Sequence, residues 1–266
     1  MPPRLSIVTP TYNQAETLEE TLKSVLSQDM GALLQYTVVD GCSTDATPDI
    51  VARLAPRFVE QGVEFAYVRE PDDGQSDAIN KGWRSARGEI AGYLNSDDYY
   101  EPGALRGVVD YFDAHPDIAW AYGGWRLVSR SRHVYVTKRH AAFSRARFLN
   151  YCDIGQPSCF FRRRLLDKVG MLDTKYHLAM DYHLWVRFAD LSDAGMIPGI
   201  LSCMRYHESA KSSARTRAQA VEVYRIAASR TQAFSFRRLM QTFYLLRALV
   251  AISVRHDVAR RIGRLE

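Results

Sequence analysis

An alternation of short apolar runs with helix-forming stretches is the feature that most constrains the fold of this 266-residue chain. Runs typical of buried strands lie at 5–8, 36–39, 65–68, 90–94 and 119–122. Helical patterns follow at 16–26, from Thr47 onward, at 77–86 and at 102–115. Asn13 with Glu16 predicts a capping box for the first helix, and Thr47 with Pro48 a capped start for the second. This order predicts an α/β fold with a mostly parallel central sheet, in which ligands bind beyond the carboxyl ends of the strands.

The pattern loosens after this first half. Between about 126 and 161 we expect loops and short strands such as 134–137, followed by a helix at 162–169. Residues 215–262 read as helices that include an apolar stretch at 239–254, interrupted by Arg247. That stretch is shorter than the roughly 18 uninterrupted apolar residues of a membrane-spanning helix. It either packs on the body or lies in a membrane interface, and both interpretations remain open.

The net charge of +5 is distributed unevenly along the chain. Residues 205–266 carry 13 Lys and Arg against 4 Asp and Glu, or +9, which leaves 22 against 26, or −4, for the body. A basic tail suits nucleic acid, anionic lipid, an acidic partner or simply a solvated helix face. The four cysteines lack CxxC spacing, which argues against a zinc site and a disulfide framework and favours a reducing compartment. The first residues show no export signal.

Carboxylates follow the predicted strands at the edge where ligands are expected. Asp40 ends the second strand and can accept hydrogen bonds from a base or ribose, whereas the adjacent 43–45 cluster is typical of turn chemistry. Asp97 and Asp98 follow the fourth strand, where two neighbouring carboxylates repel each other unless a cation lies beside them. Mg²⁺ or Mn²⁺ with a substrate diphosphate would meet that need, although a solvated Asp-Asp pair is common. Asp181 opens an amphipathic helix, either as an N-terminal cap or as a general base.

Five segments together resemble the family 2 glycosyltransferases of the GT-A fold. They are SIVTPTYN (6–13), VVDGCSTD (38–45), DAINKG (77–82), LNSDD (94–98) and MDYHLW (180–185). Their order and spacing match the family, and the resemblance covers about residues 4–212. It implies a Rossmann-like nucleotide-diphospho-sugar transferase domain at 1–212, with a nucleotide-binding half at 1–124 and an acceptor-side half at 125–212. A basic helical extension at 213–266 lies outside it.

The resemblance also implies an activity and a set of site residues. We expect an inverting enzyme of the bacterial polysaccharide-biosynthesis type that moves a sugar from a nucleotide diphosphate donor, a UDP-sugar above all, to a hydroxyl of a glycan or lipid-linked acceptor. Asp181 is the expected catalytic base. The expected nucleotide-sugar-binding residues are Pro10, Thr11, Tyr12, Asn13, Asp40, Asp72, Asp77, Lys81, Asn95, Ser96 and Lys211. The expected ligands of Mn²⁺ or Mg²⁺ are Asp97, Asp98 and His207.

Some of these residues depart from the family pattern, and others could have a purely structural role. Asn95 and Met180 stand where the family often has Asp and Glu. For Lys81, His207 and Lys211, an imidazole ligand or a phosphate-pairing ammonium competes with an ordinary surface side chain. Trp125 and the Gln156-Pro157-Ser158 segment could lie on the acceptor side, but a role in the core or in a turn fits them equally well.

Three other activities compete with transfer. A dinucleotide-dependent oxidoreductase lacks support because no GxGxxG follows the first strand. A nucleotidyltransferase would carry a glycine-rich basic loop where this chain has TPTYNQ. A catalytically silent sugar-nucleotide or glycan-binding module of the same fold needs no base, so the presence of Asp181 argues against it.

The tail suggests where the protein works. Its charge and apolar stretch predict peripheral contact with an anionic membrane from the cytoplasmic side, since each Lys or Arg near such a surface contributes about 1 kcal/mol. A helical contact between two copies is the rival interpretation. No aromatic-basic platform supports nucleic-acid binding.

Overall fold

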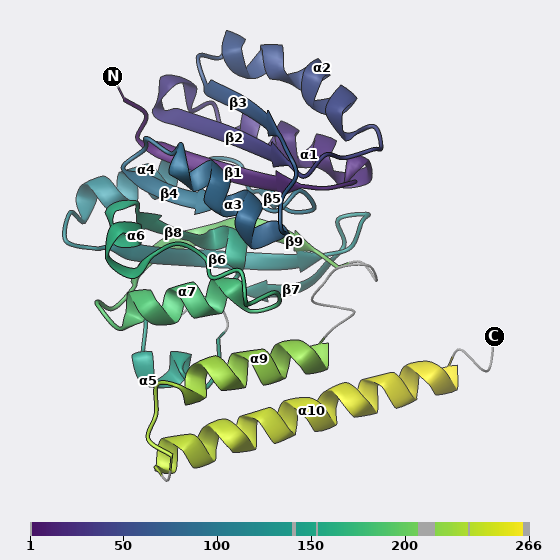
Figure 1. The fold of residues 1–266 in the computed structure, drawn as a ribbon, viewed down its shortest axis with the longest axis vertical. Coiled ribbons are helices and arrows are strands. Elements are labelled where there is room, and N and C mark those ends of the chain that lie inside the picture. Colours follow the sequence, from purple (N-terminus) through teal and green to yellow (C-terminus); the bar gives the residue numbers. More distant parts are fainter. Residues whose placement is uncertain (1, 140–141, 153, 207–215, 234, 263–266) are drawn as a thin grey trace.

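The computed structural model describes residues 2–139, 142–152, 154–206, 216–233 and 235–262. Within this part of the chain, nine strands form one mixed sheet in the order β3-β2-β1-β4-β8-β6-β9-β5, and β7 pairs with β6. The strands are β1 (Leu5–Thr11), β2 (Leu34–Asp40), β3 (Glu64–Arg69), β4 (Ile90–Tyr93), β5 (Tyr99–Tyr100), β6 (Trp120–Val128), β7 (Val134–Lys138), β8 (Cys159–Arg162) and β9 (Gly195–Arg205). The sheet runs through the middle of the molecule (Figure 1).

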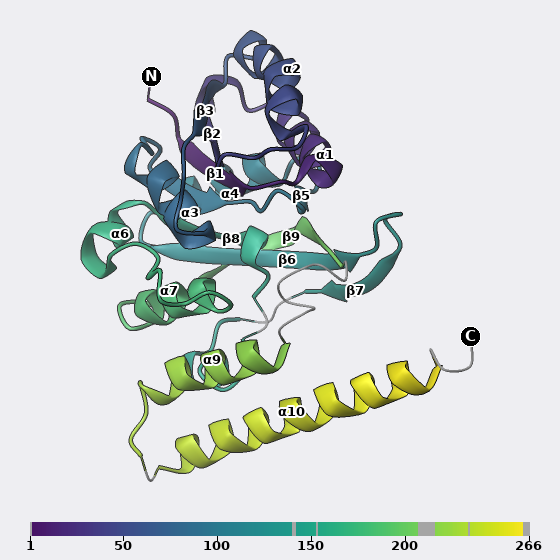
Figure 2. The ribbon, with the colours of Figure 1, turned by 45° about the vertical axis from the view of Figure 1, so that its right-hand side comes forward.

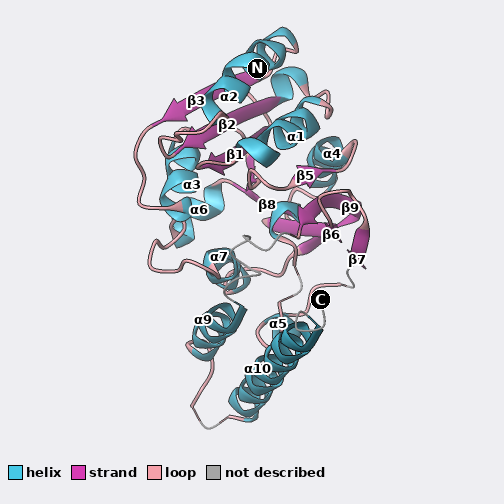
Figure 3. Ribbon diagram, turned by 90° about the vertical axis from the view of Figure 1, so that its right-hand side faces the viewer, coloured by secondary structure: helices cyan, strands magenta, loops and turns pink. Residues whose placement is uncertain are grey.

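Helices cover both faces of the sheet, as Figures 2 and 3 show. They are α1 (Ala15–Leu26), α2 (Thr47–Glu60), α3 (Gln75–Arg84), α4 (Ala104–Ala114), α5 (Arg145–Phe148), α6 (Arg164–Val169), α7 (Met180–Ala189), α9 (Thr216–Ala228) and α10 (Phe236–Ile262). Short 3-10 turns lie at Gly31–Leu33 and Gln156–Ser158. The α/β fold and its elements up to β4 match the expectation from the sequence, with bounds that shift by one to three residues.

The sheet is parallel in its first half and mixed in its second. β1 pairs in parallel with β2 and β4, and β2 with β3, so the carboxyl ends of these four strands share one edge. β8 runs antiparallel between β4 and β6. The expected parallel character is therefore confirmed for the half that follows the βα pattern, and, apart from the two-residue β5, the antiparallel strands lie where that pattern loosens.

Two hydrophobic cores lie on opposite faces of the sheet because successive strand residues point to opposite sides. In β1, Leu5 and Ile7 enter the core beneath α1, α2 and α4, whereas Val8 enters the core beneath α3, α6 and α7. A Cβ on Gly82 would lie 2.5 Å from Val8 Cγ1, so glycine allows α3 to approach β1 closely. This close approach packs the C-terminal part of α3 against β1.

The structure corrects the two predicted helix caps. Gln14 precedes α1 without a side-chain cap, and Asn13 adopts a positive φ of 51° and turns its side chain to another loop. Ala46 precedes α2, and Thr47 is already its first residue. Asp45 Oδ1 accepts the Thr47 N–H at 3.0 Å instead, which confirms the turn role expected for Asp45. Both capping predictions failed because these side chains bond across loops rather than along their own helix.

The C-terminal extension forms the helices that the sequence predicts. α9 packs beside α7, and α10 extends past the body (Figure 1). Ile226 and Ala227 of α9 are buried in the same core as α7. Among the described residues, no helix is both long and apolar enough to cross a bilayer.

Candidate active site

The loops after β1, β2 and β4 meet because these parallel neighbours end at one edge of the sheet. Asn13 follows β1, Asp40 ends β2 and Asn95 follows β4. Met180, the first residue of α7, reaches the same edge, where its Sδ lies 2.7 Å from Ser76 Oγ. The fold thus brings four separate sequence segments to one place.

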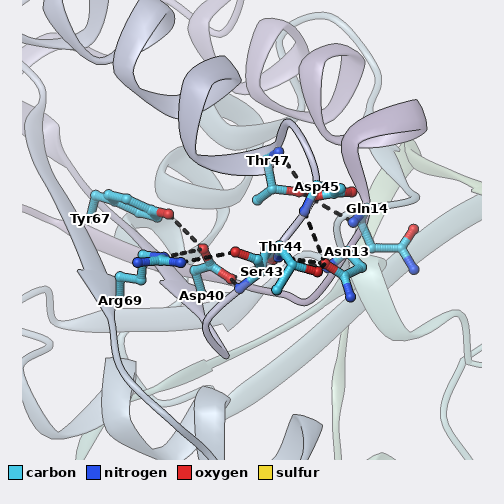
Figure 4. A network of polar contacts seen from close by, with 9 residues as sticks. All are labelled: Asn13, Gln14, Asp40, Ser43, Thr44, Asp45, Thr47, Tyr67 and Arg69. Atoms are coloured by element: carbon cyan, nitrogen blue, oxygen red, sulfur yellow. Dashed lines mark hydrogen bonds and ion pairs between the residues drawn. The ribbon is translucent and has the colours of Figure 1, made fainter.

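Asp40 is the centre of a hydrogen-bonded network (Figure 4). It is fully buried, and its Oδ1 accepts hydrogen bonds from the Ser43 N–H at 2.8 Å and the Ser43 hydroxyl at 2.6 Å. Its Oδ2 accepts the Tyr67 hydroxyl at 2.6 Å and lies 3.6 Å from Arg69 Nε. The charge of Asp40 is therefore compensated by groups of the protein itself, and Arg69 is held at the strand edge.

The loop after β1 is tied to the loop after β2. Asn13 Oδ1 accepts the Thr44 N–H at 2.8 Å, and the Asn13 N–H donates to Ser43 Oγ at 2.9 Å. Pro10 and Thr11 are buried in β1, and within the described residues the Thr11 hydroxyl has no hydrogen-bond partner. Tyr12 is 60% exposed. The expected nucleotide loop is thus tied to its neighbour by hydrogen bonds, with one aromatic ring open to solvent.

Asp72 and the start of α3 lie beside this network. A Cβ on Gly41 would lie 2.5 Å from Asp72 Oδ2, so Asp72 stands directly over the residue after Asp40. Lys81 Nζ lies 3.2 Å from Asp77 Oδ2 and 3.3 Å from Glu70 Oε1. The ammonium of Lys81 is thus neutralised within its own segment.

The acidic motif after β4 separates its two carboxylates. Asp98 is buried, its Oδ1 accepts the Arg205 N–H at 3.0 Å, and burial together with the charge of Asp97 raises its pKa well above the usual value. Asp97 is half-buried. Asn95 Oδ1 accepts the Gln75 side chain at 2.7 Å, and Ser96 is buried with its carbonyl bonded to the Thr21 hydroxyl. Of the two aspartates, Asp98 therefore faces the protein interior and Asp97 is the more accessible.

Asp181 lies in a half-buried position in the first turn of α7. Burial raises its pKa to about 6, against the opposing effect of the Tyr182 N–H, which donates to Asp181 Oδ1 at 2.7 Å. Ala179, not Asp181, occupies the position before the helix and makes no side-chain cap, whereas Asp181 accepts an N–H within the first turn, so this contact is compatible with a helix-end role as well as with a base. The pKa of Tyr93, at the end of β4, is raised well above its usual value by burial and by both Asp181 and Asp98. The charges of the α7 carboxylate and of the acidic motif therefore both act on this buried tyrosine.

The donor atoms after β4 suit a hard divalent cation. Two adjacent carboxylates, of which one is buried with a raised pKa, form a site that a cation would stabilise. Mg²⁺ and Mn²⁺ often use one or two protein carboxylates and complete their shell with water and phosphate. Within the described ranges, no three His, Cys, Asp or Glu side chains gather as ligands. His207 and Lys211, the remaining candidates, lie outside the described residues.

Several contacts at this edge were not anticipated. Arg69 could have been found, because the parallel register pairs it directly with Asp40 at the ends of β3 and β2. Gln156 was left open between an acceptor and a turn role, and its Nε2 donates to the Tyr93 carbonyl at 2.8 Å. Glu222 of α9, which binds the loop before α7, carried no sequence signal because it lies 41 residues beyond Asp181 in a region with no recognisable motif.

The comparison with known proteins agrees with this geometry. The model of the family described as "Glycosyl transferase family 2" matches residues 6–170. An uncharacterised glycosyltransferase of Mycobacterium tuberculosis H37Rv is 31% identical over 192 residues, covering 70% of this chain and 69% of the relative. A PGL/p-HBAD biosynthesis glycosyltransferase of Mycobacterium bovis BCG is 31% identical over 186 residues, with the same coverage.

Two solved structures share the fold. Staphylococcus aureus TarS 1-349, in complex with UDP-GlcNAc, superposes with a TM-score of 0.63 at 18% identity, covering 92% of this chain and 71% of that one. Mannosyltransferase PcManGT from Pyrobaculum calidifontis, in complex with GDP-Man and Mn²⁺, gives 0.65 at 22% identity, covering 97% and 76%. The expected GT-A fold is confirmed. From the match over residues 6–170 and the 31% identity to glycosyltransferases, we conclude that the chain belongs to glycosyl transferase family 2.

Proposed function

We propose that this family 2 glycosyltransferase is an inverting enzyme that uses a nucleoside diphosphate sugar, with UDP as the first candidate nucleotide, and glycosylates a hydroxyl of a glycan or lipid-linked acceptor. Asp181 is the general base of the proposal. The observation that carries it is a half-buried carboxylate with a pKa raised to about 6, at the edge where the loops of β1, β2 and β4 meet. A base is most effective when its pKa lies near the working pH.

The proposed reaction follows from that placement. Asp181 takes the proton of the acceptor hydroxyl as its oxygen attacks the anomeric carbon from the face opposite the diphosphate. The bond from that carbon to the diphosphate breaks, the nucleoside diphosphate leaves with the electron pair, and the configuration inverts. The loops after β1 and β2, with Tyr12 and Asp72, would bind the nucleotide, and the buried Asp40 would act there by holding the second loop in place.

A divalent cation fits the motif after β4. Asp97 would hold it as the principal ligand, with Asp98 beside it and His207 as a further candidate. When bound, such a cation neutralises charge on the departing diphosphate. The inward contact between Asp98 and Arg205 supports Asp97 as the main contributor.

Calorimetric titration tests the proposal directly. Wild type and Asp97→Ala are titrated with UDP, GDP and dTDP, each with and without Mn²⁺. We expect metal-dependent binding of one diphosphate that is lost in the variant, and Asp110→Ala, an exposed carboxylate in α4, serves as the matched control. No binding of any diphosphate in either condition would instead favour a silent module of the same fold. Release of nucleoside diphosphate rather than pyrophosphate would separate transfer from nucleotide activation.

We further propose that α10 contacts an anionic membrane surface on the cytoplasmic side. Phe236, Leu239, Phe243 and Leu246 are each at least 56% exposed and recur at helical spacing, and Arg237 and Arg247 are exposed beside them. Apolar side chains flanked by arginines suit an interface with anionic headgroups. Leu239→Glu with Phe243→Glu should abolish cosedimentation with phosphatidylglycerol vesicles. A change from dimer to monomer without loss of vesicle binding would instead assign the face to a second copy.

A further inference from the structure

A carboxylate of the C-terminal extension binds the loop that leads into α7. Glu222 of α9 accepts the backbone N–H groups of the three consecutive residues 177–179, at 3.3, 2.8 and 2.6 Å. Asp181 follows this loop by two residues. The position of the proposed base is therefore tied to a side chain from a different part of the chain.

A second α9 side chain binds the same loop. Gln219 lies three residues before Glu222, on the same helix face, and its Nε2 donates to the Leu178 carbonyl at 3.1 Å. Glu222 and Gln219 together bind both the N–H and the carbonyl of Leu178. Such contact with both groups fixes the orientation of the loop as well as its distance from α9.

Within the part of the chain that the structure describes, no side chain caps the start of α7 from the position before it. Ala179 occupies this position. The first N–H groups of a helix need an acceptor, and a carboxylate is favoured there by the helix dipole. Glu222 supplies an acceptor for the Ala179 N–H at this position and for the two N–H groups before it, and hydrogen bonds to a carboxylate are of the stronger, charge-assisted kind.

The rest of α9 anchors Glu222 firmly. Ile226, one turn further along α9, is 2% exposed, and Ala227 is 3% exposed, both in the core that includes Tyr182 and Leu184 of α7. A second polar link lies at the far end of α7, where Arg230 Nε donates to Asp190 Oδ2 at 2.9 Å. α9 and its following turn thus contact both ends of the helix that carries the base.

We propose that Glu222 is a positioning residue, which holds the 177–179 loop so that Asp181 points to the acceptor. The inference deepens the proposed function and rests on Asp181 being the base. It assigns a part of the catalytic arrangement to the extension beyond the family match at residues 6–170.

The charges around Asp181 agree with this role. Burial is the main cause of its raised pKa, and the negative charge of Glu222 raises it further. Among the described residues, the charge of Asp181 also raises the pKa of two buried groups, Tyr93 of β4 and Cys159 of β8. Because both of these are neutral when protonated, Glu222 is the charged group to vary.

The test compares Glu222→Gln with Arg230→Gln in the full chain. In Glu222→Gln the Asp181 pKa, followed by carboxyl ¹³C resonances and assigned with Asp181→Asn, should fall by about half a unit. Amide hydrogen exchange at 177–179 should become about tenfold faster with the loss of the carboxylate acceptor. Arg230→Gln breaks the link at the opposite end of α7 and should change neither quantity.

Activity provides the second readout. With UDP-N-acetylglucosamine and GDP-mannose as donors, Glu222→Gln should lower kcat about tenfold and leave the donor KM unchanged, because misplacing a base affects the reacting geometry. If Glu222→Gln does not fold, Glu222→Asp keeps the charge on a shorter side chain and should slow the reaction without changing the donor KM.

Two outcomes would overturn the proposal. An unchanged Asp181 pKa and unchanged exchange in Glu222→Gln would show that Glu222 does not set the position of the base. Equal effects of Glu222→Gln and Arg230→Gln would show that α9 only stabilises α7 as a whole. Full activity in Asp181→Asn would instead reject the proposed base, a result independent of the pKa and exchange measurements on Glu222.

Discussion

Two carboxylates at the same edge of the sheet have opposite surroundings. Asp40 accepts hydrogen bonds from Ser43 and Tyr67 and lies 3.6 Å from Arg69 Nε. Asp181 accepts a backbone N–H of its own helix, and burial raises its pKa to about 6. One charge is compensated by the protein and the other is not.

This difference separates a structural carboxylate from a reactive one. A carboxylate that is saturated by donors holds a loop in place and gains nothing from taking a proton. A buried carboxylate with few donors has a higher proton affinity, which general-base catalysis requires. The loops after β1 and β2 are therefore expected to shape binding, whereas the start of α7 determines the rate.

The largest expected effect is on the rate of Asp181→Asn. Removal of a general base lowers kcat by about 10²–10⁴-fold. Binding of the nucleoside diphosphate should be unchanged, because the side chain acts on the acceptor. Steady-state kinetics and calorimetry on one preparation measure both quantities.

Asp190→Asn is the matched control, since Asp190 lies at the other end of α7 and pairs with Arg145 and Arg230. Its kcat should stay within about twofold of wild type, as expected for a surface ion pair. A comparable loss in both variants would assign the effect to the stability of α7 rather than to the base.

Asp40→Asn should destabilise the fold. The amide that replaces the carboxylate presents a donor to Ser43 or Tyr67 and leaves Arg69 without its counter-charge. A buried group left unsatisfied costs about 1–3 kcal/mol, so the free energy of unfolding in urea should fall by about 3 kcal/mol. Asp49→Asn, at an exposed position in α2, should stay within about 0.5 kcal/mol of wild type. Equal stability of both variants would mean that the Asp40 network does not hold the loop.

Sequence reasoning was reliable where local patterns decide the structure. The βα alternation gave the strands β1 to β4 and their helices, because apolar periodicity reports directly which side of an element is buried. Their shared edge then brought Asn13, Asp40 and Asn95 together, since parallel neighbours end on the same side. The fold class and this half of the site were therefore accessible from the sequence.

The rest depends on contacts between distant segments. β8 and β9 were not predicted, because β8 is only four residues long and β9 alternates poorly between buried and exposed positions. The inward turn of Asp98 depends on Arg205, more than a hundred residues later. Glu222 binds its loop across 43 residues, and no pattern at either end marks that contact.

The smallest expected effect is the contribution of Asp181 to the pH dependence of the free energy of unfolding. Its pKa is about 6 in the folded protein and 3.8 in an unperturbed side chain, so the folded state binds more protons between these values. Stability from this group is therefore present below about pH 4 and is lost as pH rises through about 6. Two pH units correspond to about 3 kcal/mol as an upper bound, and about 2 kcal/mol is expected.

Urea unfolding of wild type and Asp181→Asn at pH 4 and pH 7.5 measures this effect. The variant does not titrate at this position, so it should gain about 2 kcal/mol relative to wild type between the two pH values. Asp98, whose pKa is also raised by burial, is present in both proteins and cancels in the comparison. A difference in stability that is the same at both pH values would mean that Asp181 is as well compensated as Asp40, and the contrast between the two carboxylates would disappear.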